Sequence, residues 1–163
     1  RFVGDVKALL EIHGVAPERL TIEITETAFT IDTATIQKGL ADLSTLGVKV
    51  AIDDFGMGFS SINHLRQFPI DRLKVDRSFT QAMLQGGRDT ELVSIMLRLG
   101  QIFGVRTTVE GVENEDQLEA ARALGAADVQ GFLISRPLPA TAACALACSR
   151  SGLPAEAAFR FSA

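Results

Sequence analysis

The 163-residue sequence is poor in cysteine and histidine, with two of each. Cys144 and Cys148 lie four positions apart in an alanine-rich stretch, and if this stretch is helical the spacing is unfavourable for a disulfide. His13 and His64 have no second histidine or cysteine at the spacing of metal ligands. We therefore expect small buried thiols and no zinc site, in a chain long enough to fold around an apolar core without either kind of cross-link.

Long apolar runs and a strong charge of one sign are also missing. No run approaches the roughly 18–20 residues of a membrane span, and no basic and apolar leader opens the sequence. We therefore expect a cytoplasmic domain that does not itself contact a membrane, although other domains of a parent protein could tether it to the inner membrane. Sixteen basic and twenty acidic side chains give a net charge of −4, which argues against a DNA or RNA groove built on positive charge.

Short apolar runs typical of strands alternate with longer runs of helical spacing, which predicts an α/β fold with parallel strands. The expected strands are Leu20–Thr25, Val48–Asp53, Arg72–Asp76, Val105–Glu110 and Asp128–Leu133. Helical spacing is expected around residues 3–10, 36–43, 92–103, 114–125 and 141–148, with Asn114 and Gln117 opening one of these helices.

A glycine-rich phosphate loop does not follow the first expected strand, which argues against a dinucleotide-binding fold. Five strands are also fewer than the eight of a closed barrel. Two architectures remain open at this point: an open sheet, or the later part of a barrel.

Charged residues interrupt the strands, although parallel strands covered on both faces are usually almost entirely apolar. Glu23 lies between two isoleucines, and Lys74 lies between leucine and valine. Asp53 and Asp54 end one strand, and Glu110 ends another. Each residue alone could face water on an edge strand, but together they place carboxylates near the carboxyl ends of successive strands, where such folds carry their sites.

Several carboxylates on one rim predict a site for Mg²⁺ or Mn²⁺, which prefer oxygen ligands. Two such ions can assist phosphodiester hydrolysis and make an acidic site acceptable to an anionic substrate. Lys74 could then neutralise phosphate charge or orient the water, and Glu110 could accept its proton. The loop from Asp53 to Ser61 follows with two glycines and two serines, a composition suited to gripping a ligand.

Five motifs occur in order between residues 20 and 139. They are Glu23-Ile-Thr-Glu26, Asp53-Asp54-Phe55-Gly56, Leu73-Lys74-Val75-Asp76, Glu110-Gly-Val-Glu113, and Gln130-Gly-Phe132 followed by Arg136-Pro-Leu-Pro139. In this order they resemble the EAL-domain family of cyclic di-GMP phosphodiesterases. The resemblance implies a TIM-type (β/α)8 barrel that opens cyclic di-GMP to linear pGpG with two Mg²⁺ or Mn²⁺ ions.

The resemblance also implies a role for each residue. Glu23 and Asp53 would be metal ligands, Asp54 would serve the second metal, Lys74 would contact the water or the metal site, and Glu110 would be the general base. A further group would support the loop, the rim or the ligand: Glu26, Gly56, Ser60, Glu113 and Gln130.

The family's Glu-Ala-Leu motif and its asparagine-containing segment, which supply further metal ligands, are absent from this sequence. Met57, Phe59 and Val109 are milder departures from the family pattern. We therefore expect residues 1–163 to be one truncated EAL domain, a partial barrel without its first strands, with a family-like region to about residue 140 and a C-terminal helix and tail beyond it. Alone, this chain is expected to be inactive or nearly so.

Two other functions remain open. The domain could be a degenerate one that binds cyclic di-GMP or a protein partner without hydrolysis, although the retained acids speak against this. A metal-independent glycosidase with a carboxylate pair is a remote alternative. An incomplete barrel would also expose apolar edges, so we expect a homodimer. The alternative, which the family resemblance implies, is a chain covalently linked to sensor or diguanylate cyclase (GGDEF-type) domains.

Overall fold

The computed structural model describes residues 1–30, 33–57 and 62–150. Its strands are β1 (Thr21–Thr25), β2 (Lys49–Phe55), β3 (Arg72–Val75), β4 (Arg106–Val109) and β5 (Asp128–Val129). Its α-helices are α1 (Phe2–His13), α2 (Thr33–Leu46), α3 (Ile62–Gln67), α4 (Arg77–Ala82), α5 (Arg88–Phe103), α6 (Glu115–Ala123) and α7 (Ala140–Arg150). Three short 3₁₀ turns complete the list: η1 (Pro17–Arg19), η2 (Glu26–Thr30) and η3 (Met83–Gln85).

All five strands form one parallel sheet in which each new strand joins the edge beside the previous one, in the order β1-β2-β3-β4-β5. A doubly wound sheet reverses its strand order at a switch point, and this sheet does not. The unbroken order is that of a β/α barrel, which decides between the two architectures that the sequence left open.

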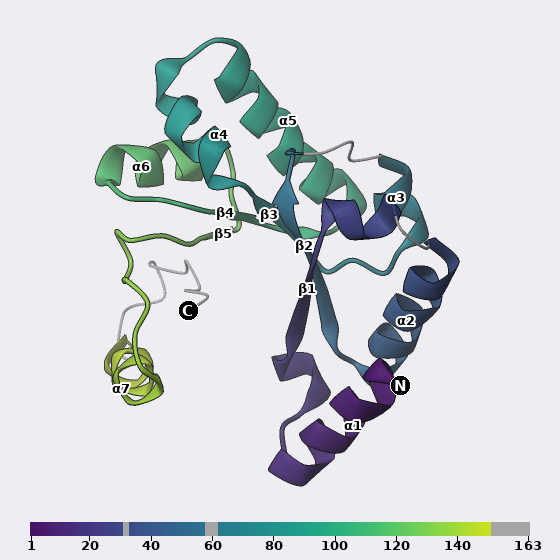
Figure 1. Ribbon diagram of the computed structural model, residues 1–163. Coiled ribbons are helices and arrows are strands. Elements are labelled where there is room, and N and C mark those ends of the chain that lie inside the picture. Colours follow the sequence, from purple (N-terminus) through teal and green to yellow (C-terminus); the bar gives the residue numbers. More distant parts are fainter. Residues whose placement is uncertain (31–32, 58–61, 151–163) are drawn as a thin grey trace.

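The two faces of the sheet differ in chemistry because side chains alternate along each strand. Helices α2 to α6 lie along one side of the sheet, and α7 stands away from it on the other side (Figure 1). The helix-covered face is apolar and supplies the core, with Val50, Ile52, Leu73, Val75 and Val109 almost fully buried. The opposite face, called here the inner face, carries the charged residues that interrupt the strand pattern.

The expected helices are present, and their ends follow the predicted signals. The Asn114 side chain accepts a hydrogen bond of 2.9 Å from the Gln117 backbone N–H, which opens α6 as the sequence predicts. Gly104 ends α5 in the left-handed conformation, with φ of 67°. None of the helices in the described ranges is long and apolar enough to cross a membrane.

The structure differs from the predictions made from the sequence at three elements, which are β5, α3 and α4. The expected strand Asp128–Leu133 is only two residues long, because the chain turns at Gly131 and the Ile134 N–H donates to the Gly131 carbonyl. Helices α3 and α4 were not expected, since neither is long enough to show a clear apolar period. The tail beyond residue 150 and the side chains of Cys144 and Cys148 lie outside the description, although α7 contains both cysteines as predicted.

Two helical glycines give a matched test of how closely the helices pack on the sheet. At Gly100 in α5, an added Cβ would overlap the Thr107 methyl group and lie 3.0 Å from the Val105 carbonyl oxygen. At Gly39 in α2, an added Cβ meets nothing within 4 Å. We expect Gly39→Ala to raise the free energy of unfolding by about 0.5–1 kcal/mol, and Gly100→Ala to lower it by about 1–3 kcal/mol. Urea denaturation of both variants measures this, and equal effects would contradict the close α5–sheet contact.

Candidate active site

Charged side chains from four neighbouring strands meet around Lys74. Its ammonium nitrogen lies 2.9 Å from a carboxylate oxygen of each of Glu23, Asp53 and Glu110. Glu23 lies in the middle of β1, Asp53 near the end of β2 and Glu110 just beyond β4, and the parallel pairing brings the three toward the same edge of the sheet. The structure thus brings together the residues that the sequence singled out as isolated charges.

Burial and ion pairing act in opposite directions on Lys74, which is 6% exposed. Burial lowers the pKa of its ammonium, but the hydrogen bonds that it donates to Asp53, Glu23 and Glu110 outweigh burial and raise that pKa above its ordinary value. Lys74 is therefore positively charged at neutral pH. Its contribution to stability is present below the ordinary lysine pKa and is lost as the pH rises through the higher folded-state pKa.

For Glu110, in contrast, the effect of burial on the pKa outweighs that of the ion pair with Lys74. Burial raises the pKa of its carboxyl, the negative charges of Asp53 and Glu23 raise it further, and the Lys74 ammonium partly offsets both, which leaves the pKa above its ordinary value. A carboxylate with a raised pKa accepts a proton more readily than a carboxylate with the ordinary pKa.

Asp54 reaches the same cluster because the end of β2 is irregular. Regular alternation would turn Asp54 to the face opposite Asp53. The pairing of β2 with β3 instead shifts register between Ile52 and Phe55, and Asp54 has a left-handed φ of 53°. Carboxylate oxygens of Asp53, Asp54 and Glu110 consequently lie within 4.8 Å of one another.

A buried glutamate supports the loop that follows. Glu26 is 9% exposed, and its carboxylate accepts a 3.0 Å hydrogen bond from the Gly56 N–H. Gly56 has a φ of 103°, and an added Cβ would lie 2.5 Å from Met96 Cε and 2.7 Å from a Phe79 ring carbon. Both backbone conformation and space therefore require glycine here. The remaining loop candidate, Ser60, lies outside the described residues.

Two expected rim residues occupy the loops beyond β4 and β5. Glu113 is exposed, and its backbone N–H donates to the Gln117 side chain at 2.7 Å. Gln130 follows β5 on the inner face beside Glu110, and its N–H donates to the Val109 carbonyl at 2.9 Å. These contacts fix the backbone at both positions, and the roles of the two side chains stay predictions.

Sequence reasoning missed two features near the cluster. The buried Thr80 hydroxyl donates to the Glu110 backbone carbonyl and ties α4 to the site. Asp128, at the start of β5, is fully buried between Arg72 and Arg106. The rule that singled out Glu23 and Lys74, a charge inside a buried strand, would have found Asp128 as well. Nothing in the local pattern marks Thr80.

The donor set fits a hard divalent cation. Asp53, Asp54, Glu110 and Glu23 offer carboxylate oxygens alone, the ligands that Mg²⁺ and Mn²⁺ prefer. One ammonium cannot neutralise four carboxylates, so the cluster attracts positive charge. The spacing within the group of three is close to that of oxygens that share one ion or two neighbouring ions.

A parallel β/α arc with carboxylates at its strand ends defines the class of protein: a barrel whose site lies at the carboxyl face. Comparison with known families specifies it further, because residues 1–137 match the EAL domain. The chain belongs to the EAL domain family.

Two relatives show how much of the chain is shared with other proteins. The uncharacterized protein y4lL of Sinorhizobium fredii is 42% identical over 95% of this chain and 19% of its own length. The bifunctional diguanylate cyclase/cyclic di-GMP phosphodiesterase MucR of Pseudomonas aeruginosa is 38% identical over 85% of this chain and 20% of its own length. The chain thus spans about a fifth of these relatives.

Solved structures match the fold closely. The MucR phosphodiesterase in complex with c-di-GMP has a TM-score of 0.82 at 37% identity, over 86% of this chain and 57% of the other. The manganese and c-di-GMP complex of Klebsiella pneumoniae BlrP1 has a TM-score of 0.78 at 33% identity, over 83% of this chain and 34% of the other. The five-stranded sheet is thus part of an EAL barrel.

Replacing Lys74 tests the electrostatics of the cluster. In Lys74→Met the positive charge that lowers the pKa of Glu110 is gone, so that pKa should rise further. Carboxyl ¹³C shifts of labelled glutamate, followed through a pH titration, measure it. Lys49→Met is the control, because Lys49 pairs with Asp71 at 2.9 Å and contacts none of the four acids. An unchanged Glu110 titration in Lys74→Met would contradict the described ion pair.

Proposed function

We propose that the parent of this chain hydrolyses cyclic di-GMP to linear pGpG with the help of divalent cations. The observation that carries the proposal is the meeting of Glu23, Asp53, Asp54 and Glu110 around Lys74 at one rim. Membership of the EAL domain family and the phosphodiesterase activity named for MucR support the choice of substrate.

Asp53, Asp54 and Glu23 are the proposed cation ligands, because their oxygens are the most accessible of the cluster. Glu23 and Asp53 have 47% and 26% of their side chains exposed, against 16% for Glu110. Two bound Mg²⁺ or Mn²⁺ ions would supply charge neutralisation at the phosphate and ease deprotonation of the attacking water. Manganese in the BlrP1 complex supports this type of cofactor without deciding between the two metals.

Glu110 is the proposed proton acceptor. Water attacks phosphorus, the bond from phosphorus to the ribose 3′ oxygen breaks, and one proton of the water passes to Glu110. The departing 3′ oxygen takes up a proton from solvent water, and Glu110 returns its proton to solvent. The raised pKa of its carboxyl suits this role. Lys74 supplies a fixed positive charge that orients the water and offsets the charge developing on the phosphate.

The remaining candidates hold the rim in shape. Glu26 fixes the loop at Gly56 through its hydrogen bond, and we assign Ser60 to the same loop. Gln130, directly after β5, is the proposed contact to the substrate, and Glu113 is proposed to support the turn after β4. Each of these roles follows from position in the barrel and from the family resemblance.

Hydrolysis is proposed for the parent protein, since the chain spans only part of each relative. The Glu-Ala-Leu and asparagine segments of the family, which carry further ligands, are not in this sequence. We therefore expect the 163-residue chain alone to release little or no pGpG. The likeness to MucR further supports a parent in which this domain is linked to a diguanylate cyclase domain. A homodimer is the alternative arrangement that we propose.

Glu110→Gln in the parent protein separates proton acceptance from metal binding. We expect pGpG release to fall by about 10²–10⁴-fold, while the affinity for Mn²⁺ measured by calorimetry stays close to that of the unmodified protein. The control is Glu119→Gln, an exposed residue of α6, which should change neither quantity.

Three other results would change the assignment. Loss of Mn²⁺ affinity in Glu110→Gln would make Glu110 a ligand. Full turnover in that variant would remove it from the chemistry. Tight cyclic di-GMP binding without hydrolysis by the unmodified parent would replace the enzyme with a binding domain.

A further inference from the structure

A second ionic cluster lies on the inner face below the proposed site. Asp128 is fully buried, and its two carboxylate oxygens accept hydrogen bonds from the Arg106 Nη2 at 2.7 Å and Nε at 3.1 Å. Arg72 Nη1 lies 2.9 Å from the same carboxylate and donates to the Thr108 hydroxyl at 2.8 Å. The four side chains, called here the base cluster, connect β3, β4 and β5.

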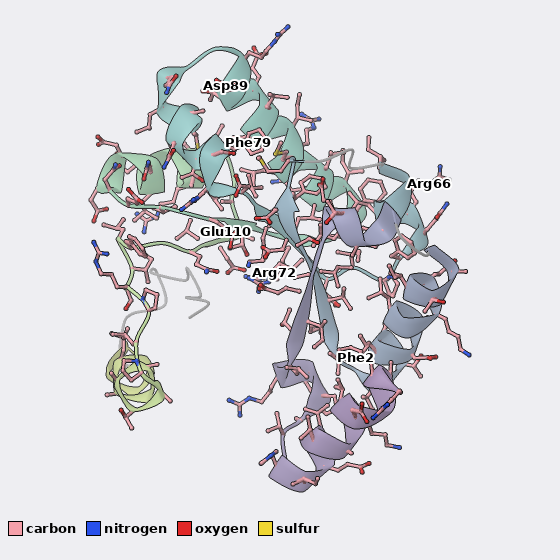
Figure 2. The ribbon with its side chains drawn as sticks, viewed as in Figure 1. Phe2, Arg66, Arg72, Phe79, Asp89 and Glu110 are labelled. Atoms are coloured by element: carbon pink, nitrogen blue, oxygen red, sulfur yellow. The ribbon has the colours of Figure 1, made fainter. Side chains whose placement is uncertain are left out.

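The base cluster is in register with the site above it. On each strand, one of its members lies two positions before a site residue and therefore on the same face: Arg72 before Lys74, Thr108 before Glu110, and Asp128 before Gln130. Figure 2 shows Arg72 and Glu110 both on the side of the sheet away from α5. Two residues of strand span about 6–7 Å, so the base cluster forms the next layer of the barrel interior.

This layer is unusual for its position. Branched apolar side chains usually fill the interior of a β/α barrel, and they stabilise a fold at least as well as a buried ion network does. An ion network additionally fixes the relative position of the strands that carry it, because a forked arginine–carboxylate pair tolerates little lateral or rotational displacement. A shift of β5 against β4 would leave the buried Asp128 carboxylate without its partners.

We infer that the base cluster is a positioning layer: Arg72, Arg106, Thr108 and Asp128 hold β3, β4 and β5 so that Lys74, Glu110 and Gln130 converge. The importance of that convergence rests on the proposed function, whereas the convergence itself is a property of the folded chain.

The two arginines make different contacts, which gives the inference a specific signature. Arg72 uses the single nitrogen Nη1 for both of its contacts, so a lysine can replace it. Arg106 uses two nitrogens against two oxygens, so a lysine cannot. A positioning role therefore predicts that Arg72→Lys behaves like the unmodified chain, and that Arg72→Met and Arg106→Lys do not.

The test measures the position of Lys74 and the metal affinity separately, on the 163-residue chain. ¹⁵N–¹H spectra of lysine ammonium groups report whether Lys74 is held by its carboxylates. We expect its resonance in the unmodified chain and in Arg72→Lys, and its shift or loss in Arg72→Met and Arg106→Lys. Mn²⁺ affinity from calorimetry should fall about tenfold in the latter two variants, as for other residues that orient metal ligands. Lys49→Met, which breaks the nearby Lys49–Asp71 pair, should leave both readouts unchanged.

A purely stabilising role makes a different prediction: melting temperatures fall, but the Lys74 resonance and the Mn²⁺ affinity of the folded variants do not change. That result, or no ordered Lys74 resonance in the unmodified chain, would overturn the inference. If Arg72→Met does not fold, the contrast between Arg72→Lys and Arg106→Lys decides. If the unmodified chain and its parent bind no Mn²⁺, the proposed function fails, and the ammonium spectra alone decide the positioning role.

Discussion

The ammonium group of Lys74 is the point on which this arrangement depends. One buried cation lies 2.9 Å from carboxylates that come from three different segments of the sheet. Without it, the carboxylates of Glu23, Asp53 and Glu110 would repel one another, and burial already disfavours the charged form of Glu110. With it, they remain close enough to act together, and the excess of negative charge still favours divalent cations. The parallel register of β1 to β4 is what allows this sharing, because it aligns the carboxyl ends of the strands at one edge.

The departures from regular strand geometry are as important as the register. A register shift and a left-handed residue turn Asp54 toward Asp53, although consecutive strand residues normally face opposite sides. Glu26 then holds the following loop through the Gly56 N–H, and the tight space around Gly56 keeps that loop against Phe79 and Met96. The site is thus formed by a regular parallel sheet and one local irregularity at the end of β2.

Much of this could be predicted from the sequence. The five strands, the long helices and the Asn114 cap follow from local patterns, and the convergence of the acids follows from the rule that parallel strands end at one edge. The sequence also placed Asp54 among these acids, but it did not predict the irregular strand end that turns Asp54 toward them, because this irregularity depends on pairing with β3 and leaves no local pattern. The charge of Asp128 could have been found by the rule that found Glu23, but its pairs with Arg72 and Arg106 depend on contacts between segments distant in the chain. The short β5 was missed because the turn at Gly131 was not recognised in the sequence.

The central claim is that the rim around Asp53 and Asp54 binds divalent cations. A crystal of the parent protein grown with Mn²⁺, with data collected at an energy where manganese scatters anomalously, tests it most directly. The account predicts an anomalous peak about 2.0–2.2 Å from carboxylate oxygens of Asp53 and Asp54, with Glu23 completing the ligands. An ordered rim with no peak, or manganese bound only elsewhere on the molecule, would contradict it.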